Sequence, residues 1–372
     1  MFIRQQARLY PTKDQIHFLN QEIGNQRFVW NFILANSNER YKTEKKFIFY
    51  GESVVLLSEL KKTYEFLSIG GSQALQQTLK DQEQSLKNFL KSRKTGGHFG
   101  YPKFKKKGNG GSVRYPQGCS LDSKSLKIPK LKTKIKIKNQ QNIQEFNSVS
   151  IIKKPSGKWF ASFVVEIPDV EKVEITTDSK VVGIDLNSKF FVVLDSGQAI
   201  ENQKFLKKKE KRLKKYQRRM SKMVKCSSNK NKQRIKVARL HEKIANSRKD
   251  FVEKITTQVA TTYDIICLED LNVKGMQKWN GRMIQEAPFR MFRDKMTWKA
   301  NKFGKHLTII NRFDPTSKVC SGCGSVLDLT LNDRWIDCDC GISIHRDHNA
   351  AKNIKFLGLK YTVGTTELKA CG

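Results

Sequence analysis

The 372-residue sequence has few acidic residues for its size and no long apolar run. It contains 35 Asp and Glu against 71 Lys and Arg, a formal net charge of +36. Such a cationic excess indicates a large polyanionic partner, and nucleic acid is favoured over a membrane. No apolar stretch approaches the roughly 20 residues of a spanning helix, and residues 1–6 do not resemble a signal peptide. We therefore expect no membrane contact and a compartment in which thiols stay reduced.

The remaining composition is that of a globular chain. Hydrophobic residues make up 38% of the sequence and aromatic residues 10%, which argues against wholesale disorder. The length suffices for two or three domains with their own cores. In a reducing compartment, paired cysteines are more often metal ligands than disulfides.

Four of the eight cysteines have the spacing of a structural zinc site. Cys320 and Cys323 form a C-x-x-C knuckle, and Cys338 and Cys340 follow after fourteen residues. Four thiolates at such a spacing bind Zn²⁺ tetrahedrally. Because the second knuckle is one residue short, His345 is an alternative fourth ligand. The other four cysteines have no partners by spacing and are expected to be inert: Cys119, Cys226, Cys267 and Cys371.

Three acidic residues stand at the ends of apolar elements. Asp185 ends a buried strand predicted from residue 181, Glu269 ends another over 265–268, and Asp347 lies at or near a helix start. A buried, unpaired carboxylate costs several kcal/mol, so a metal is favoured over simple capping. Neighbouring strand residues face opposite sides, and we assign Glu269 rather than Asp270 to the Asp185 side.

These carboxylates are expected to converge on Mg²⁺ or Mn²⁺, which prefer hard oxygen ligands. Two such ions about 4 Å apart can stabilise both the attacking and the leaving oxygen of a phosphodiester.

Three basic segments are candidates for nucleic-acid contact. Residues 96–107 mix lysines with Phe and Tyr, which suits either a base-stacking surface or a solvated basic loop. Residues 130–138 alternate, so that the lysines of a strand there would share one face. Residues 202–254 hold 21 Lys and Arg against four Asp and Glu and predict a helical hairpin with a narrow apolar seam and a basic exterior.

The pattern of the N-terminal half predicts a β-rich module with inserted helices. Residues 2–10 alternate like a strand, and Thr12 with Gln15 forms a capping box that starts a helix. A second helix is predicted from residue 72 to 90, and strands at 148–153 and 159–167.

In combination, these motifs resemble TnpB, the nuclease family encoded by insertion-sequence transposons and related to type V CRISPR effectors. The matching segments are 9–13 (LYPTK), 27–31 (RFVWN), 100–105 (GYPKFK), 183–186 (GIDL), 268–272 (LEDLN) and the knuckles with 346–351 (RDHNAA). The chain departs from the family where Asn187 replaces a frequent Gly, where His345 replaces a frequent Asp, and in its C-x-C second knuckle.

The resemblance implies an α+β multidomain fold with a RuvC-type, RNase H-like nuclease domain, in which the metal-binding acids are Asp185, Glu269 and Asp347. Its implied domains are a wedge-type β-barrel (1–11 and 96–180), a helical recognition lobe (12–95), the nuclease domain (181–313 and 347–372) and a zinc-binding module for target nucleic acid (314–346).

The implied function is Mg²⁺-dependent, RNA-guided DNA cleavage beside a short flanking motif. The partners would be target DNA and a guide RNA transcribed from the transposon end, with one protein monomer per RNA in a prokaryotic, nucleoid-associated cytoplasmic setting. Three alternatives are an RNA-guided repressor without cleavage, a DNA transposase with a similar acidic triad, and a zinc-binding RNA chaperone.

Overall fold

The computed structural model describes residues 1–108, 110–138, 143, 145–273, 275–276, 287–330 and 333–363. The chain divides into two compact units, Met1–Pro168 and Asp169–Gly372. Within the described residues, no helix is both long and apolar enough to cross a membrane.

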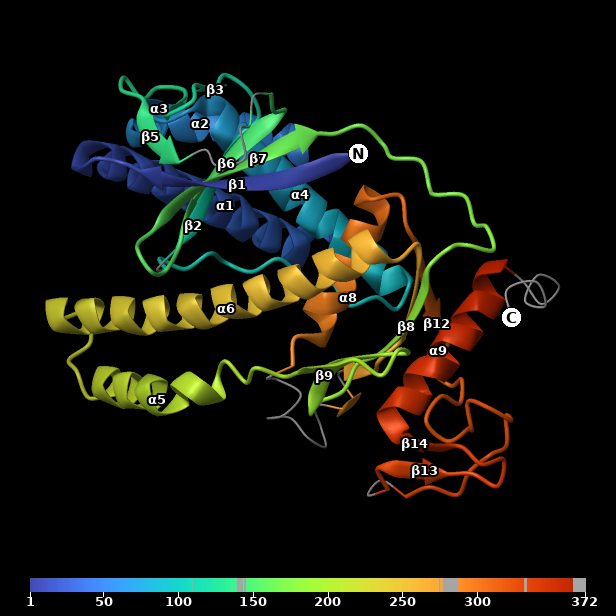
Figure 1. Ribbon diagram of the computed structural model, residues 1–372. Coiled ribbons are helices and arrows are strands. Elements are labelled where there is room, and N and C mark those ends of the chain that lie inside the picture. The colour runs from blue at the N-terminus through green and yellow to red at the C-terminus, as the bar shows by residue number, and fades with distance from the viewer. Residues whose placement is uncertain are drawn as a thin grey trace. The chain divides into compact units, whose positions relative to one another are not determined.

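The N-terminal unit is built on a seven-stranded antiparallel sheet (Figure 1). Its strands are β1 (Phe2–Tyr10), β2 (Gly111–Tyr115), β3 (Ser120–Leu121), β4 (Ser125–Lys127), β5 (Ile135–Lys138), β6 (Ser148–Lys153) and β7 (Trp159–Glu166). Their order is β2-β6-β7-β1-β5-β4-β3. Tyr115 near one edge and Leu126 near the other share one buried cluster with Leu9 of the central strand. The sheet therefore curls around a single core, as expected for a wedge-type module.

Helices of the same unit are inserted between β1 and β2. They are α1 (Lys13–Glu44), α2 (Tyr50–Thr63), α3 (Phe66–Ile69) and α4 (Ser72–Lys94). The predicted capping box is present: Gln15 N–H donates to Thr12 Oγ1, and Thr12 N–H donates to Gln15 Oε1. The sequence did not predict α2, although Leu57 and Leu60 of this helix pack into the helical core with Val29 and Leu79.

The alternating segment 130–138 is a strand only in its second half. β5 begins at Ile135, and Lys130 has a left-handed backbone with φ of 65°. Residues 130–134 therefore turn before the strand, because a non-glycine residue with positive φ interrupts an extended ladder. The prediction of one continuous lysine ladder was wrong for these residues.

The C-terminal unit contains a five-stranded mixed sheet. Its strands are β8 (Val181–Asp185), β9 (Phe190–Leu194), β10 (Ala199–Glu201), β11 (Ile265–Glu269) and β12 (His306–Ile310). The order is β10-β9-β8-β11-β12. The first three of these strands pair antiparallel with one another, whereas β11 runs parallel to β8 and to β12. This order and these directions are those of an RNase H-like sheet.

Helices cover both faces of this sheet. They are α6 (Ser228–Thr262) and α8 (Phe289–Lys302) on one face and α9 (Arg346–Val363) on the other. Side chains alternate accordingly: Val182 and Ile184 pack with Val259 of α6, whereas Ile265 and Ile354 belong to a cluster on the α9 side.

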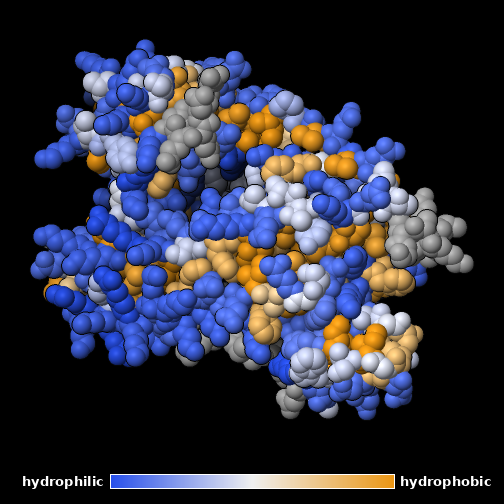
Figure 2. All heavy atoms as spheres, in the orientation of Figure 1, coloured by the Kyte–Doolittle hydropathy of each residue, from blue (hydrophilic) through white to orange (hydrophobic). Residues whose placement is uncertain are grey.

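A basic helical hairpin projects from the sheet, as the sequence predicted. It is formed by α5 (Lys207–Ser221) and α6, which meet along a narrow seam of Leu213, Val237, Leu240 and Ile244. On the face drawn in the space-filling view, the surface of this hairpin is mostly hydrophilic (Figure 2). The apolar contact between the two helices is limited to this seam, and the lysines and arginines on their outer faces suit a polyanion.

The backbone of α9 lies directly against β8 and β11. A Cβ atom at Gly183 of β8 would overlap the carbonyl oxygen of Ala351 and lie 2.6 Å from the backbone nitrogen of Lys355. Gly358 of α9 makes an equally close approach to Cys267 of β11. Glycine is required at Gly183 because the neighbouring atoms belong to backbone and cannot rotate away.

We predict that Gly183→Ala lowers stability by about 1–3 kcal/mol, since the added methyl group must push α9 away from the sheet. Chemical denaturation followed by circular dichroism measures this change. Gly24→Ala is the control, because Gly24 lies within α1 and a Cβ atom added there would point into open space; it should gain up to about 1 kcal/mol. Equal stability of Gly183→Ala and wild type would contradict the close packing.

Candidate functional site

The three acids predicted from the sequence lie at one end of the five-stranded sheet. Asp185 ends β8 and Glu269 ends β11, and because these strands are adjacent and parallel, both side chains follow the same edge. Asp185 lies two residues after Gly183, and Glu269 lies two residues after Cys267. Because every second residue of a strand points to the same face, both acids face α9. Asp347 lies in the first turn of that helix. Sequence-distant acids are thus gathered on one face.

Asn187 links two of these carboxylates directly. Its Nδ2 donates to Asp185 Oδ2 at 3.1 Å and to Asp347 Oδ2 at 3.0 Å. The two carboxylate oxygens therefore lie within two hydrogen-bond lengths of each other. Asn187 Oδ1 accepts from the backbone N–H groups of Lys189 and Phe190, which orients the amide. The sequence had marked Asn187 only as a departure from the family.

Electrostatics of the site favour a cation. Asp185 is 8% exposed, and burial, together with the charges of Asp347 and Glu269, raises its pKa to about 7 despite the hydrogen bond from Asn187. Burial and the neighbouring Asp270 also raise the pKa of Glu269. Carboxylates crowded in this way are stabilised in their charged form by a divalent ion. Hard oxygen donors fit Mg²⁺ or Mn²⁺.

The three carboxylates are nevertheless spaced more widely than the ligands of one bare ion. Among the described residues, only the cysteine cluster brings three or more His, Cys, Asp or Glu ligand atoms within 4.8 Å of one another. The amide of Asn187 occupies the space between Asp185 and Asp347. A wider spacing suits ions that keep part of their water shell.

Asp270 has a different role from its neighbour Glu269. Its carboxylate accepts from Arg293 at 2.7 Å and from Arg312 at 2.5 Å. Both arginines, with Arg290, line a pocket of about 210 Å³ that also includes Glu269. Asp270 therefore positions guanidinium groups beside the acids, where they could bind phosphate.

These arginines were missed in the sequence. Arg290 and Arg293 lie on α8, whose apolar face is formed by Phe289, Phe292 and Met296. The helical spacing of these apolar residues could have predicted α8, and with it the exposed positions of the two arginines.

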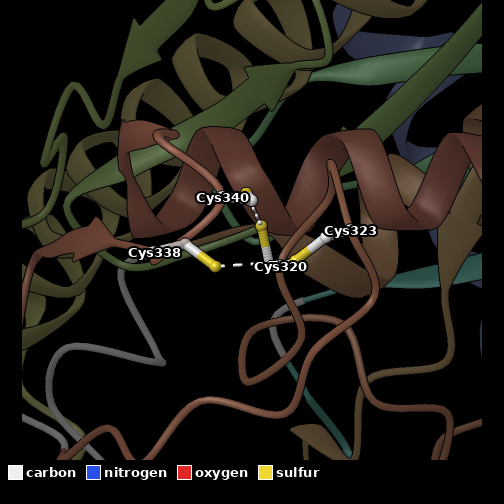
Figure 3. Close-up of side chains that lie close together, drawn as sticks. All are labelled: Cys320, Cys323, Cys338 and Cys340. Carbon is white, nitrogen blue, oxygen red and sulfur yellow. Dashed lines mark hydrogen bonds between the residues drawn. The ribbon is translucent and has the colours of Figure 1, made fainter.

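The second site is the cysteine cluster (Figure 3). Cys320 Sγ lies 3.6 Å from Cys340 Sγ, and Cys323 Sγ lies 3.5 Å from Cys338 Sγ. All four sulfur atoms lie within 4.8 Å of one another, which is compatible with a tetrahedral zinc site. Hydrogen bonding to Ser325 lowers the pKa of Cys323 to about 6, which favours the thiolate form that binds metal.

His345, the alternative fourth ligand, lies outside the cysteine cluster. Its Nδ1 accepts from the backbone N–H of Asp347 at 3.2 Å, and its ring packs edge-on against Phe190 and Trp335. The structure therefore places it at the start of α9, beside the acids.

The remaining cysteines stand apart. Cys119, Cys226 and Cys267 are free, and Cys267 is buried; Cys371 lies outside the described residues.

Comparisons with known proteins agree with this class of fold, an RNase H-like domain joined to a cysteine-knuckle module. The family model OrfB_IS605, described as "Probable transposase", matches residues 162–280. "Cas12f1-like, TNB domain" matches residues 289–354, and a helix-turn-helix domain model matches residues 1–46.

Two relatives extend this match over most of the chain. A protein of Streptomyces pristinaespiralis named "Putative RNA-guided DNA endonuclease" is 33% identical over 95% of this chain and 88% of its own length. Another so named, InsQ of Escherichia coli (strain K12), is 34% identical over 73% of this chain and 66% of its own length. The chain therefore belongs to the TnpB family of insertion-sequence proteins, also called OrfB of IS605.

The fold also resembles the protein in a Cas12f1–sgRNA–target DNA complex. The TM-score is 0.57 at 15% sequence identity, over 92% of this chain and 83% of the other. At this identity the likeness concerns the fold alone.

Removing one cysteine ligand tests the metal cluster. We predict that Cys320→Ser lowers bound zinc and melting temperature together, because a structural metal stabilises only the folded module. Metal analysis and thermal unfolding measure the two quantities. Cys226→Ser is the control, since Cys226 is an exposed cysteine outside the cluster. Full zinc content in Cys320→Ser would contradict four-cysteine ligation.

The buried Asp185 predicts a pH dependence in magnesium-free buffer. Because its folded pKa is about 7 and an unfolded Asp has a pKa of about 3.9, the folded state binds more protons between these values. Stability should therefore fall as pH rises from about 4 to 7, by up to roughly 4 kcal/mol from this group. Asp185→Asn should flatten the profile and raise stability at neutral pH, as measured by chemical denaturation. Asp294→Asn, which removes an exposed carboxylate, is the control; an unchanged slope in Asp185→Asn would rule out the proposed titration.

Proposed function

We propose that this protein is an RNA-guided DNA endonuclease whose acidic site hydrolyses phosphodiester bonds with the help of Mg²⁺ or Mn²⁺. The observation that carries the proposal is the gathering of Asp185, Glu269 and Asp347 at one end of an RNase H-like sheet, with Asn187 donating to two of them. Membership of the TnpB family supports the same activity.

The acids would hold the divalent ions, and Asn187 would keep two of the acids, Asp185 and Asp347, in position. When bound, the ions would supply charge neutralisation and an activated water for attack on phosphorus. Arg290, Arg293 and Arg312 lie beside Glu269 and would bind the phosphates that flank the scissile bond. In this arrangement the protein needs no nucleophilic side chain.

A guide RNA and a target DNA are the proposed partners. The formal charge of +36 and the basic α5–α6 hairpin supply a large phosphate-binding surface. We further propose that zinc closes the cysteine module and that one protein chain binds one RNA. The domains are proposed with the boundaries expected from the sequence: 1–11 and 96–180, 12–95, 181–313 with 347–372, and 314–346.

Cleavage of a guide-matched plasmid tests the function. We predict that Asp185→Ala lowers the cleavage rate at least about 100-fold, since losses of this size already follow from disturbing groups that only support a metal ligand. Binding of the guide RNA should be unchanged. Asp178→Ala is the control, because Asp178 is exposed in a turn before β8.

Unimpaired cutting by Asp185→Ala would remove the site from the mechanism. Strand transfer of transposon ends by the protein without RNA would instead support the transposase alternative. The matching family model is described as "Probable transposase".

A further inference from the structure

One short basic segment of the N-terminal unit is fixed by side chains of α1. Trp30 Nε1 donates to the carbonyl oxygen of Lys103 at 3.0 Å. Asn31 Nδ2 donates to the carbonyl oxygen of Lys105 at 2.9 Å, and its Oδ1 accepts from the Lys105 N–H at 2.7 Å. Residues 103–105 belong to no helix or strand, yet three hydrogen bonds define their backbone. We call residues 103–106 the basic strap.

Phe104 is held outward in this strap. Its side chain is 51% exposed, although the residues on either side of it are bonded to α1. Among the described aromatic residues, no ring pairs with Phe104. A large apolar ring fixed in solvent by its neighbours' hydrogen bonds suits a flat partner such as a nucleic-acid base.

A basic pocket of about 350 Å³ is lined in part by Lys105 and Lys106, the two strap residues that follow Phe104. Its cationic walls are Arg27 of α1 and Lys105 and Lys106 of the strap, and its remaining lining comes from Ile23, Gln26 and residues 110–112. The Lys105 ammonium lies 3.7 Å from the centre of the Trp30 ring, which directs this side chain back towards α1. No acidic residue lines the pocket, and among the described residues neither Arg27 nor Lys106 forms an ion pair. The pocket therefore favours an anion.

We propose that the basic strap binds one unpaired nucleotide, with the base stacked on Phe104 and a phosphate in the pocket of Arg27 and Lys106. Phe104 and Lys106 are two residues apart, so their Cα atoms are separated by at most about 7 Å, within the span of one nucleotide. The proposal deepens the proposed function and rests on it, since a guide RNA or a separated DNA strand would supply the nucleotide. A duplex would not, because its bases are already stacked on one another.

Photo-crosslinking of the full-length chain tests the position of the base. The probes are a short single-stranded RNA carrying 5-iodouridine, the DNA oligonucleotide of the same sequence carrying 5-iododeoxyuridine, and its duplex. We expect mass spectrometry to find the cross-link on Phe104 with a single strand and not with the duplex. The single strand that cross-links more strongly identifies RNA or DNA as the source. A cross-link confined to the duplex, or none at Phe104, would overturn the proposal.

Binding measurements separate stacking from charge. Phe104→Leu should weaken single-strand binding about 5- to 150-fold without changing the dependence of affinity on salt, whereas Phe104→Trp should restore it. Lys106→Gln should reduce the slope of log affinity against log salt by roughly 0.7, and Lys106→Arg should not. Phe2→Leu is the matched control, because Phe2 is 61% exposed in the same unit and lies outside the pocket.

Wild-type affinity in both Phe104→Leu and Lys106→Gln would contradict the site. The same cross-linking is repeated in Asp185→Ala, where a cross-link at Phe104 is expected to persist. Since neither readout depends on cleavage, failure of the strap and failure of the nuclease assignment are distinguished.

Discussion

The close approach of α9 to β8 is the contact on which the acidic site depends. Gly183 has no side chain, so the backbone of α9 near Ala351 can lie against the strand. Asp347 is one turn before that contact, and Asp185 is two residues after Gly183 along the strand. A single backbone contact therefore brings together acids from opposite ends of the unit. Lys355 and His348 of α9 reinforce it by bonding to Asp195, just beyond β9.

The cysteine module is joined to the same helix. Asn349 Nδ2 donates to the carbonyl oxygen of Val319, and Asn349 Oδ1 accepts from the Ser321 N–H. Asn353 also donates to Val319. These bonds hold the backbone on either side of Cys320 against the first turns of α9, close in sequence to Asp347. One helix therefore carries Asp347 and also anchors the cysteine module, although no cysteine belongs to the acidic site.

Opposite charges are separated within this basic protein. The acids face α9, whereas the arginines beside them are held by Asp270 on the other side of the β11 pleat. The charge of Asp270 still contributes to the raised pKa of Glu269, and its two arginine partners offset part of that charge. Two consecutive residues at the end of β11 therefore serve different surroundings, with Glu269 among the acids and Asp270 bonded to arginines.

The sequence predicted those parts of the fold and site that depend on local patterns. Strand alternation indicated Glu269 over Asp270, and cysteine spacing indicated a cluster that the structure brings together. It could not predict α2, whose stabilising contacts are with α1 and α4. Asn187 is the most instructive case, because in sequence it is only a polar residue after a strand. Its function depends on Asp347, which no local pattern places beside it. An amide that donates to both acids restricts their separation before any cation binds, so the two carboxylates need less rearrangement when a cation replaces that donor.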